Sequence, residues 1–270
     1  MKLFFIPTLV LTLAISAAPA WAENGRKEQD ATPEHENFFD DFSRVSVGGA
    51  VITRPEFIGA DKHETKAFPI IQGQYNFSER DAVYLRGPSL GYSHAYNRHM
   101  QVGVKTSFRA SRRADDDARL SGMGDVGTAF EVGPWVKTKF YGFSLAADTL
   151  FDVTGDHDGF VANLRAGKRI AEMPGPSLEF YAETSWGSGD FMDTFFDVTA
   201  AQAQPGRPAF DADAGFYQSA VGSVFQYTLH KSVFLRLDGQ LQFLHGDADD
   251  SPVTFDNTNF RGFLGLGYTF

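Results

Sequence analysis

The chain ends with Gly262-Phe263-Leu264-Gly265-Leu266-Gly267-Tyr268-Thr269-Phe270. From Leu264 onward, every second residue is large and apolar, and Phe263 is the apolar exception on the other face. A period of two residues is typical of a strand with one side toward lipid and one toward a polar interior. A terminal aromatic residue on such a strand resembles the signal that the outer-membrane assembly machinery recognises. We therefore interpret Tyr268 and Phe270 as an assembly signal and predict a bacterial outer-membrane β-barrel.

The same alternation returns in segments of about ten residues along the chain, as expected for strands that cross a membrane. A soluble β-sandwich also alternates, but its strands are usually shorter, about 5–6 residues. In these segments the face opposite the apolar one carries charges in strand after strand, which a polar lumen tolerates. The pattern favours an all-β, up-and-down antiparallel transmembrane barrel. The clearest segments are 100–109, 141–151, 160–167, 178–186 and 233–243.

The N-terminus has the pattern of a secretory signal peptide. Met1-Lys2 precedes an apolar run from Leu3 to Ala18, and Ala20-Trp21-Ala22 supplies the small residues of a cleavage site. The run is short for a transmembrane helix, and no positive flank follows it. We predict a cleaved signal peptide over 1–22, a flexible, acidic periplasmic arm over 23–42 and a barrel over 43–270. Docking of a partner on the arm is the alternative to flexibility.

The composition fits an exported β-barrel and argues against nucleic-acid binding. The chain has no cysteine, so disulfides do not stabilise it, and a barrel whose strands all pair is one alternative. It contains 27 Phe, 9 Tyr and 27 Gly, yet its mean hydropathy is −0.24, because polar lumen residues dilute the apolar ones. The net charge of −10 argues against nucleic acid as a partner.

The lengths of the connections predict which way the strands run. Bacterial barrels have short periplasmic turns and longer outer loops. Short and long connections alternate without exception when followed back from Phe270, which places both termini on the periplasmic side. The long or polar connections are 246–258, 187–213, 152–159 and 110–123, and the short ones are 230–231, 171–176, 138–139 and 97–98.

The number of strands follows from this orientation. Eight strands from residue 100 to the end require an even number over 43–96, but three segments stand out there: 43–53, 66–77 and 82–93. Gly87-Pro88-Ser89 interrupts the third, and proline cannot donate a hydrogen bond inside a sheet. Dividing that segment into 82–87 and 89–96 gives twelve strands. Ten strands, with one segment not spanning, is the alternative.

Charged residues of both signs are predicted to face the lumen. They could form interior ion pairs that make a narrow barrel rigid, or a charged ring that selects solutes in a small pore. Aromatic residues predicted at strand ends suit the girdles at the two membrane surfaces. The predicted lumen charges are Lys105, Arg109, Glu131, Asp148, Arg165, Glu179, Glu183, Arg236 and Asp238, and the predicted girdle residues are Phe77, Trp135, Tyr141, Trp186, Tyr227 and Tyr268.

Two acidic stretches are candidates for a catalytic site or a cation-binding site. Asp156-His157-Asp158 lies at a predicted outer loop, where barrel proteases carry acidic and histidine groups, but a polar loop tip explains it. Asp247, Asp249 and Asp250 could bind a divalent cation, although their spacing is not that of an EF-hand. A solvated acidic loop, cross-linked to lipopolysaccharide by divalent ions, is the simpler interpretation. We predict no catalytic, cofactor-binding or metal-ligating residues, and therefore no enzyme.

Several motifs occur in an order and spacing that together are specific, although each is weak alone. They are Pro55–Asp61, Phe68-Pro69, Leu120–Asp125, Glu131–Gly133, Asp156–Gly159, Phe195–Thr199, Tyr217, Gly246–Val253 and Gly265–Phe270. With these motifs, the mature chain from Val45 onward resembles the MipA/OmpV family of outer-membrane barrels.

The resemblance implies a non-enzymatic scaffold at the outer membrane. In such a role the barrel would bring a lytic transglycosylase together with a penicillin-binding protein, while contacting outer-membrane lipid and lipopolysaccharide. A narrow solute pore, or a role in stress or adhesion, is the alternative. The family has no agreed catalytic residues, so none can be transferred to this chain.

Overall fold

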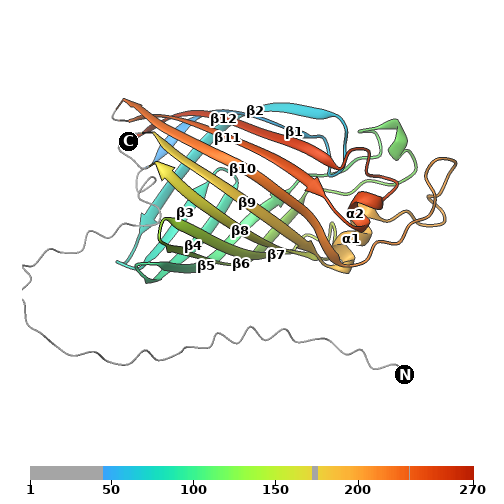
Figure 1. Ribbon diagram of the computed structural model, residues 1–270, viewed down its shortest axis with the longest axis horizontal. Helices are drawn as coiled ribbons and strands as arrows, with labels where there is room; N and C mark the ends of the chain where they lie inside the picture. Colours follow the sequence, from blue (N-terminus) through green and yellow to red (C-terminus); the bar gives the residue numbers. More distant parts are fainter. Residues whose placement is uncertain (1–44, 172–175, 231) are drawn as a thin grey trace, which may run out of the picture. The chain divides into compact units, whose positions relative to one another are not determined.

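The computed structural model describes residues 45–171, 176–230 and 232–270. These residues form a closed barrel of antiparallel strands in which each strand pairs with its neighbours in sequence and β1 pairs with β12 (Figure 1). The predicted signal peptide (1–22) and periplasmic arm (23–42) lie outside the described residues. The strands are β1 (Ser46–Pro55), β2 (His63–Asn76), β3 (Asp81–Arg86), β4 (Ser89–Asn97), β5 (Met100–Arg109), β6 (Ala129–Phe140), β7 (Phe143–Asp152), β8 (Phe160–Ala171), β9 (Ser177–Gly187), β10 (Gly215–His230), β11 (Val233–Leu244) and β12 (Thr258–Thr269).

The prediction of twelve strands is confirmed, including the division at Gly87-Pro88. Strand β3 ends at Arg86, and β4 begins at Ser89. Gly87 has a φ of 55°, a left-handed conformation that glycine adopts without strain. The hairpin thus depends on glycine for its turn and on proline to interrupt the strand.

One predicted turn, at 138–139, was placed wrongly. Strand β6 continues to Phe140, and the turn is Tyr141-Gly142, with φ values of 49° and 73°. Two successive positive φ values match the two-residue turn whose twist suits a tight hairpin. Sequence did not indicate it, because tyrosine seldom adopts this conformation.

The last strand closes the barrel as its position in the sequence suggests. The backbone N–H of Phe270 donates to the carbonyl oxygen of Val45 at 2.9 Å. The hydroxyls of Ser46 and Thr269 lie 2.8 Å apart, one residue further along the same pair of strands. The rings of Tyr268 and Phe270 lie 5.0 Å apart, and both are exposed on the outer side. Their role as an assembly signal stays a prediction.

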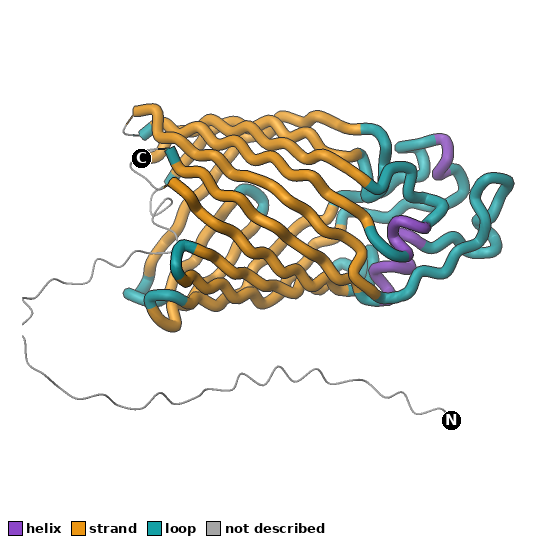
Figure 2. Tube along the Cα trace, in the orientation of Figure 1, coloured by secondary structure: helices purple, strands orange, loops and turns teal. Residues whose placement is uncertain are grey.

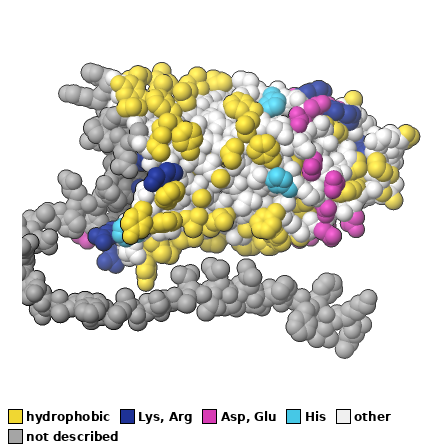
Figure 3. Space-filling view, viewed as in Figure 1, with side chains coloured by type: hydrophobic (Ala, Val, Ile, Leu, Met, Phe, Trp, Pro, Cys, Tyr) yellow, Lys and Arg dark blue, Asp and Glu magenta, His cyan; other side chains and the backbone are white. Residues whose placement is uncertain are grey.

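The outer face of the barrel is apolar. Exposed large apolar residues alternate with interior ones on strand after strand, as Leu264 and Leu266 do on β12, and they form a broad band over the strands (Figure 3). In lipid every backbone polar group must find a partner within the protein, which a closed barrel provides. A closed barrel with this apolar band spans a membrane.

The two ends of the barrel differ. Short turns and the C-terminus lie at one end, whereas the long loops and helices α1 (Gly189–Phe196) and α2 (Asp247–Asp250) lie at the other (Figure 2). Short turns mark the periplasmic end of a bacterial barrel and long loops the outer end. Among the described residues, no helix is both long and apolar enough to cross a membrane.

Large aromatic side chains fill the interior where the neighbouring strand carries glycine. A Cβ on Gly222 would lie 2.5 Å from the ring of Tyr181, and one on Gly267 would lie 2.5 Å from the ring of Phe234. Each glycine therefore makes room for a ring on the adjacent strand. This pairing of aromatic residues with glycine packs the lumen near mid-height at Tyr181 and toward the periplasmic end at Phe234.

Trp135 belongs to this interior packing, so its assignment to the membrane girdle was wrong. Its ring lies 6.4 Å from that of Tyr84 in an edge-to-face arrangement, and a Cβ on Gly103 would lie 2.8 Å from the indole. Glu131 is four residues before Trp135 on β6 and faces the same side. Trp135 therefore points into the barrel rather than toward lipid.

Candidate functional site

A cap with its own hydrophobic core covers the outer end of the barrel. Helix α1 presents Phe191, Met192 and Phe196, which are fully or almost fully buried. With the buried Phe195 they recur at spacings of one, three and four residues, which gives the helix one apolar face. A second cluster joins the remaining loops to the first through Phe210. The first cluster contains Val126, Val161, Phe191, Met192, Phe195, Phe196, Ala212, Tyr217, Leu244 and Ala248, and the second Phe57, Ala60, Leu120, Met123, Val198 and Val253.

Side chains from two other loops bind the last carbonyl groups of α1. Arg112 Nη1 donates to the carbonyl oxygen of Phe195 at 2.6 Å, and Arg112 Nη2 to that of Thr194 at 3.2 Å. Ser251 Oγ donates to the carbonyl oxygen of Phe196 at 2.5 Å. A helix leaves its last carbonyl groups without partners inside the helix, so these contacts stabilise its end. Burial, with a smaller effect of the nearby Arg207, lowers the pKa of Arg112 to about 10, and the group stays cationic at neutral pH.

Ion pairs join the first and third outer connections of the cap. Lys62 Nζ lies 2.7 Å from Asp117 Oδ2, and Arg119 Nη2 lies 2.6 Å from Asp61 Oδ1. The Arg119 guanidinium also stacks 3.6 Å above the ring of Phe255. Hydrogen bonds from Arg119 and Lys62 hold the pKa of Asp117 well below its usual range. The Asp117 carboxylate is therefore ionised at neutral pH in the folded cap.

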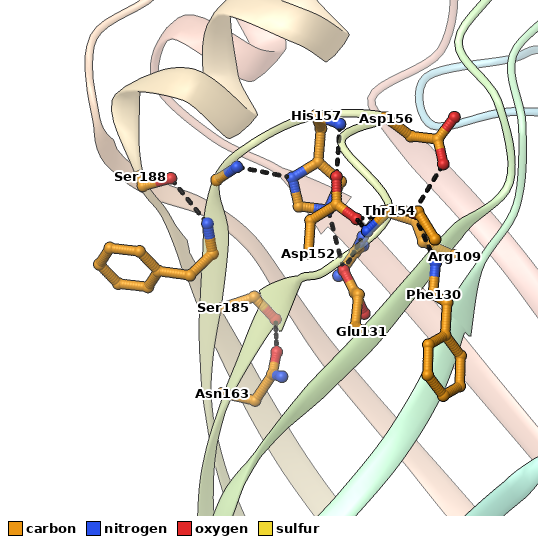
Figure 4. Close-up of polar contacts among 12 residues, drawn as sticks. Arg109, Phe130, Glu131, Asp152, Thr154, Asp156, His157, Asn163, Ser185 and Ser188 are labelled. Carbon is orange, nitrogen blue, oxygen red and sulfur yellow. Dashed lines mark hydrogen bonds and ion pairs between the residues drawn. The ribbon is translucent and has the colours of Figure 1, made fainter.

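Beneath the cap lies a polar cluster of Arg109, Glu131 and His157, of which Glu131 and His157 are fully buried (Figure 4). Glu131 Oε1 accepts from Arg109 Nε at 2.7 Å and lies 3.2 Å from His157 Nε2. The imidazole packs against the rings of Phe191 and Phe195. Buried charges are costly unless paired, and here two partners surround one carboxylate. The cluster connects two barrel strands to α1.

This burial changes the interpretation of Asp156-His157-Asp158. Asp158 is exposed, as a loop tip should be, but the His157 side chain has no accessible surface. Asp152 accepts hydrogen bonds from the backbone N–H groups of His157 at 2.7 Å and Thr154 at 2.8 Å, which fold the loop back over the barrel. His157 thus supports the cap. It does not face the solvent, as a catalytic histidine of a barrel protease would.

A chain of hydrogen bonds crosses the interior below this cluster. Lys105 Nζ donates to Asp148 Oδ1 at 2.9 Å, and Asn163 Nδ2 donates to Asp148 Oδ2 at 2.8 Å. Ser185 Oγ lies 2.7 Å from Asn163 Oδ1 (Figure 4). The four residues lie on β5, β7, β8 and β9. These hydrogen bonds therefore connect strands across five of the twelve strands of the wall, through the lumen.

A third set of charges centres on Arg165. Its guanidinium lies 3.4 Å above the ring of Tyr181 and within 3.8 Å of both Glu179 and Glu183. The Tyr181 hydroxyl donates to Asp238 Oδ1 at 3.1 Å. Asp238 Oδ2 in turn lies 3.4 Å from Arg236. The structure thus brings all nine lumen charges named from sequence into ion pairs. The pairs cross between strands, except that Arg236 and Asp238 both lie on β11.

A cavity of about 270 Å³ separates the cap from these interior charges. Its wall carries amide side chains from several strands together with charged ones. The amides include Gln218, Gln240, Gln242 and Asn259, and the charged residues are Arg54, Glu56, Arg109, Glu183 and Arg261. Asn259 is buried, and its Oδ1 has no hydrogen-bond partner among the described residues. A wall of amides suits ligands that both donate and accept hydrogen bonds.

The acidic outer loop makes structural contacts instead of gathering its carboxylates. Asp247 Oδ2 accepts from the backbone N–H of Asp213 at 2.7 Å, and Asp249 Oδ1 accepts from Asn257 Nδ2 at 2.8 Å. Within residues 45–171, 176–230 and 232–270, no three His, Asp or Glu side chains come together in a way that could hold a metal ion.

Sequence reasoning missed several residues of the cap. Arg112 carries no signal in a single sequence, because its partners are distant in the chain. Tyr217 was noted only as part of the family resemblance, which did not indicate its place in the cap core. Phe191, Met192, Phe195 and Phe196 do carry one, since apolar residues at helical spacing are unusual inside a polar loop. That pattern could have predicted α1.

Solved outer-membrane barrels are similar to this chain at low identity. The NanC porin has a TM-score of 0.44 and 10% identity, with 84% of this chain and 100% of that chain covered. LpxR from Salmonella typhimurium has a TM-score of 0.41 and 9% identity, with 83% and 100% covered. An outer-membrane channel from Pseudomonas putida F1 has a TM-score of 0.39 and 11% identity, with 84% and 96% covered. No curated protein sequence matches the chain.

A protein-family model does match the sequence. It is described as MltA-interacting protein MipA and covers residues 47–270, from the first strand to the last residue. The matched range includes both the barrel and every loop of the cap. The closed barrel, its apolar outer band and this match agree on a protein of the bacterial outer membrane. The chain belongs to the MipA family of MltA-interacting proteins.

Proposed function

We propose that this barrel is a non-enzymatic scaffold that holds peptidoglycan-synthesis proteins and a lytic transglycosylase at the periplasmic face of the outer membrane. The family is named for interaction with MltA, which supports a protein partner of this kind. A scaffold needs a stable framework and an accessible surface, and it needs no reactive group or open channel.

The observation that carries the proposal is that the outer end and the interior are both occupied by the protein's own side chains. The cap core covers the outer mouth, and Tyr181 and Trp135 fill the lumen below it. The periplasmic rim is then the surface that remains for protein partners.

Tyr141 is the most prominent described feature of that rim. Its side chain is 94% exposed, and its φ of 49° is a conformation that side chains other than glycine and asparagine seldom adopt. Lys168 Nζ donates to its carbonyl oxygen at 2.9 Å and fixes the turn. Tyrosine is one of the residue types enriched among the side chains that dominate the binding energy of protein interfaces.

Site-specific photocrosslinking in intact cells tests the scaffold. A photoreactive phenylalanine analogue replaces Tyr141 on the periplasmic rim or, as a matched control, Ala203 in an exposed outer loop. We expect a lytic transglycosylase in the adducts from position 141 and none from position 203. Absence of any peptidoglycan enzyme from position 141, and from Arg98 in the neighbouring turn, would overturn the proposal.

A further inference from the structure

The barrel wall is incomplete above the β3–β4 hairpin. Strand β2 pairs with β3 only over Gln72–Asn76, and β5 pairs with β4 only up to Lys105. The hairpin turn therefore lies within the wall, short of the outer end (Figure 2). Above it, within the described part of the chain, neither His63–Ile71 of β2 nor Thr106–Arg109 of β5 has a strand on the side facing the hairpin. We call this opening the wall gap.

The hydrogen-bond pattern shows which residues of β2 border the wall gap. Phe270 N donates to Val45 O, so odd-numbered residues of β1 bond to β12 and even-numbered ones to β2. The register of β1 and β2 pairs even with even, as in Ser46 with Gln72. Odd-numbered residues of β2 therefore direct their backbone groups into the gap. Pro69 is one of them, and a proline, which has no N–H to donate, suits such a free edge.

The wall gap has defined borders. At its lower corner, Ser89 Oγ donates to the carbonyl oxygen of Thr106 at 2.6 Å, and Leu90 N donates to Thr106 Oγ1 at 2.9 Å. At its outer end, the ion pairs Lys62–Asp117 and Asp61–Arg119 join the loops that follow β1 and β5. An unpaired strand edge is not tolerated against hydrocarbon alone, so polar groups must reach it.

The amide-walled cavity lies directly behind the wall gap. Its lining includes Phe108–Ser111, at the β5 border of the gap, and Arg54–Gly59, from the end of β1 and the loop at the outer end of the gap. Lys66, which shares the inward face of β2 with Glu64, still has 63% of its side chain exposed. Lys66 therefore keeps most of its side chain accessible beside the gap. The outer rim, by contrast, is apolar, with Ile71, Leu90 and Phe108 all about half exposed.

We propose that the wall gap admits the sugar head group of an outer-leaflet glycolipid, whose acyl chains stay outside against the apolar rim. The amides of Gln240, Gln242 and Asn259 donate to and accept from sugar hydroxyls. The unpartnered Oδ1 of Asn259 gains a hydrogen bond, and head-group hydroxyls satisfy the free edge of β2. This site lies at the opposite end of the barrel from the proposed protein scaffold and is independent of it.

Photocrosslinking from single cysteines tests the lipid at the gap, because the chain has no cysteine of its own. A benzophenone maleimide is attached to Lys66→Cys in isolated outer membranes. The control, Arg236→Cys, also faces inward, but its strand pairs on both sides. We expect a glycolipid adduct at position 66 and none at 236. An adduct with the N-terminal arm or with a second copy, or no lipid adduct at 66, would overturn the proposal.

A binding experiment separates a lipid head group from a free sugar. The full chain in a sugar-free amine-oxide detergent is titrated with an alkyl glucoside or with methyl glucoside and followed by native mass spectrometry. We expect saturable binding of the alkyl glucoside only, weakened at least tenfold by Gln242→Leu but not by Gln226→Leu, which faces inward outside the cavity lining. Equal binding of methyl glucoside, or no binding of either, would contradict a glycolipid site. Heat-dependent gel mobility confirms that both variants are folded.

Discussion

Arg112 Nη1 lies 2.6 Å from the carbonyl oxygen of Phe195, which joins the loop after β5 to the last turn of α1. The guanidinium is buried, and it supplies a charge where the helix leaves carbonyl groups unpaired. Two outer loops with strands β6 to β9 between them thus meet at one side chain. The cap therefore behaves as one unit, and its stability should depend on this contact.

Replacing Arg112 with methionine should loosen the cap without opening the barrel. Loss of hydrogen bonds to a charged donor costs about 1.5–3 kcal/mol, so the amides of α1 should exchange roughly 10- to 100-fold faster. Hydrogen-exchange mass spectrometry of residues 189–197 measures this change. Arg113→Met is the control, since Arg113 is largely exposed and pairs only with Asp115. Equal exchange in Arg112→Met and the unmodified protein would show that the contact is dispensable.

Removing one partner of the Arg109–Glu131 pair should destabilise the protein far more than removing both. Glu131→Leu removes the carboxylate partner of a largely buried guanidinium, and breaking a buried ion pair in this way costs up to about 3–5 kcal/mol. Exchanging both partners for apolar residues is often close to neutral. Thermal unfolding in detergent, followed by heat-dependent gel mobility, measures the effect. The double variant Arg109→Met with Glu131→Leu should recover much of the lost stability. A double variant less stable than Glu131→Leu would contradict this explanation.

The barrel could be predicted in detail because each strand repeats the same physical requirement. Lipid on one side and a polar interior on the other impose a period of two, and the alternation of short and long connections fixes the direction. The twelve-strand prediction depended on Pro88, and the structure places a turn there. The pairing of Lys105 with Asp148 was not predictable, since β6 stands between their strands.

The cap was not predicted, because its core is made from loops that are distant in sequence. Val126, Tyr217 and Ala248 come from three different connections or their edges, and no short pattern links them. Trp135 was misplaced for a related reason. Aromatic residues occupy both membrane girdles and filled interiors, and only the facing Gly103 distinguishes the two environments.

Acid should release the contact between the first and third outer connections only well below neutral pH. The pKa of Asp117 is lowered by its hydrogen bonds to Arg119 and Lys62, so its contribution to stability is complete above the usual carboxylate pKa of about 4. That contribution decreases as the pH falls from about 4 toward the lowered pKa. Protease cleavage within 56–62 should therefore increase below about pH 4. Asp117→Asn should be cleaved readily at every pH. If cleavage of this variant still increased below about pH 4, Asp117 would not be the group that controls the contact.

A side chain at Gly222 should disturb the interior packing. A Cβ there would lie 2.5 Å from the Tyr181 ring and 2.7 Å from the carbonyl oxygen of Gly239. Overpacking a filled interior costs about 1–3 kcal/mol, so Gly222→Val should lower the thermal midpoint of the barrel. Gly49→Val is the control, because nothing lies within 4 Å of its Cβ position. An unchanged midpoint for Gly222→Val would show that the interior has room to relax.

Planar-bilayer recording tests most directly whether the interior is closed, and hence whether this barrel acts through surface contacts or through transport. The full-length mature protein should show no steady conductance. The combined variant Tyr181→Ala with Trp135→Ala, which removes two of the rings that fill the lumen, should show channel openings. Steady, ion-selective conductance from the unmodified protein would contradict a closed scaffold and establish a pore.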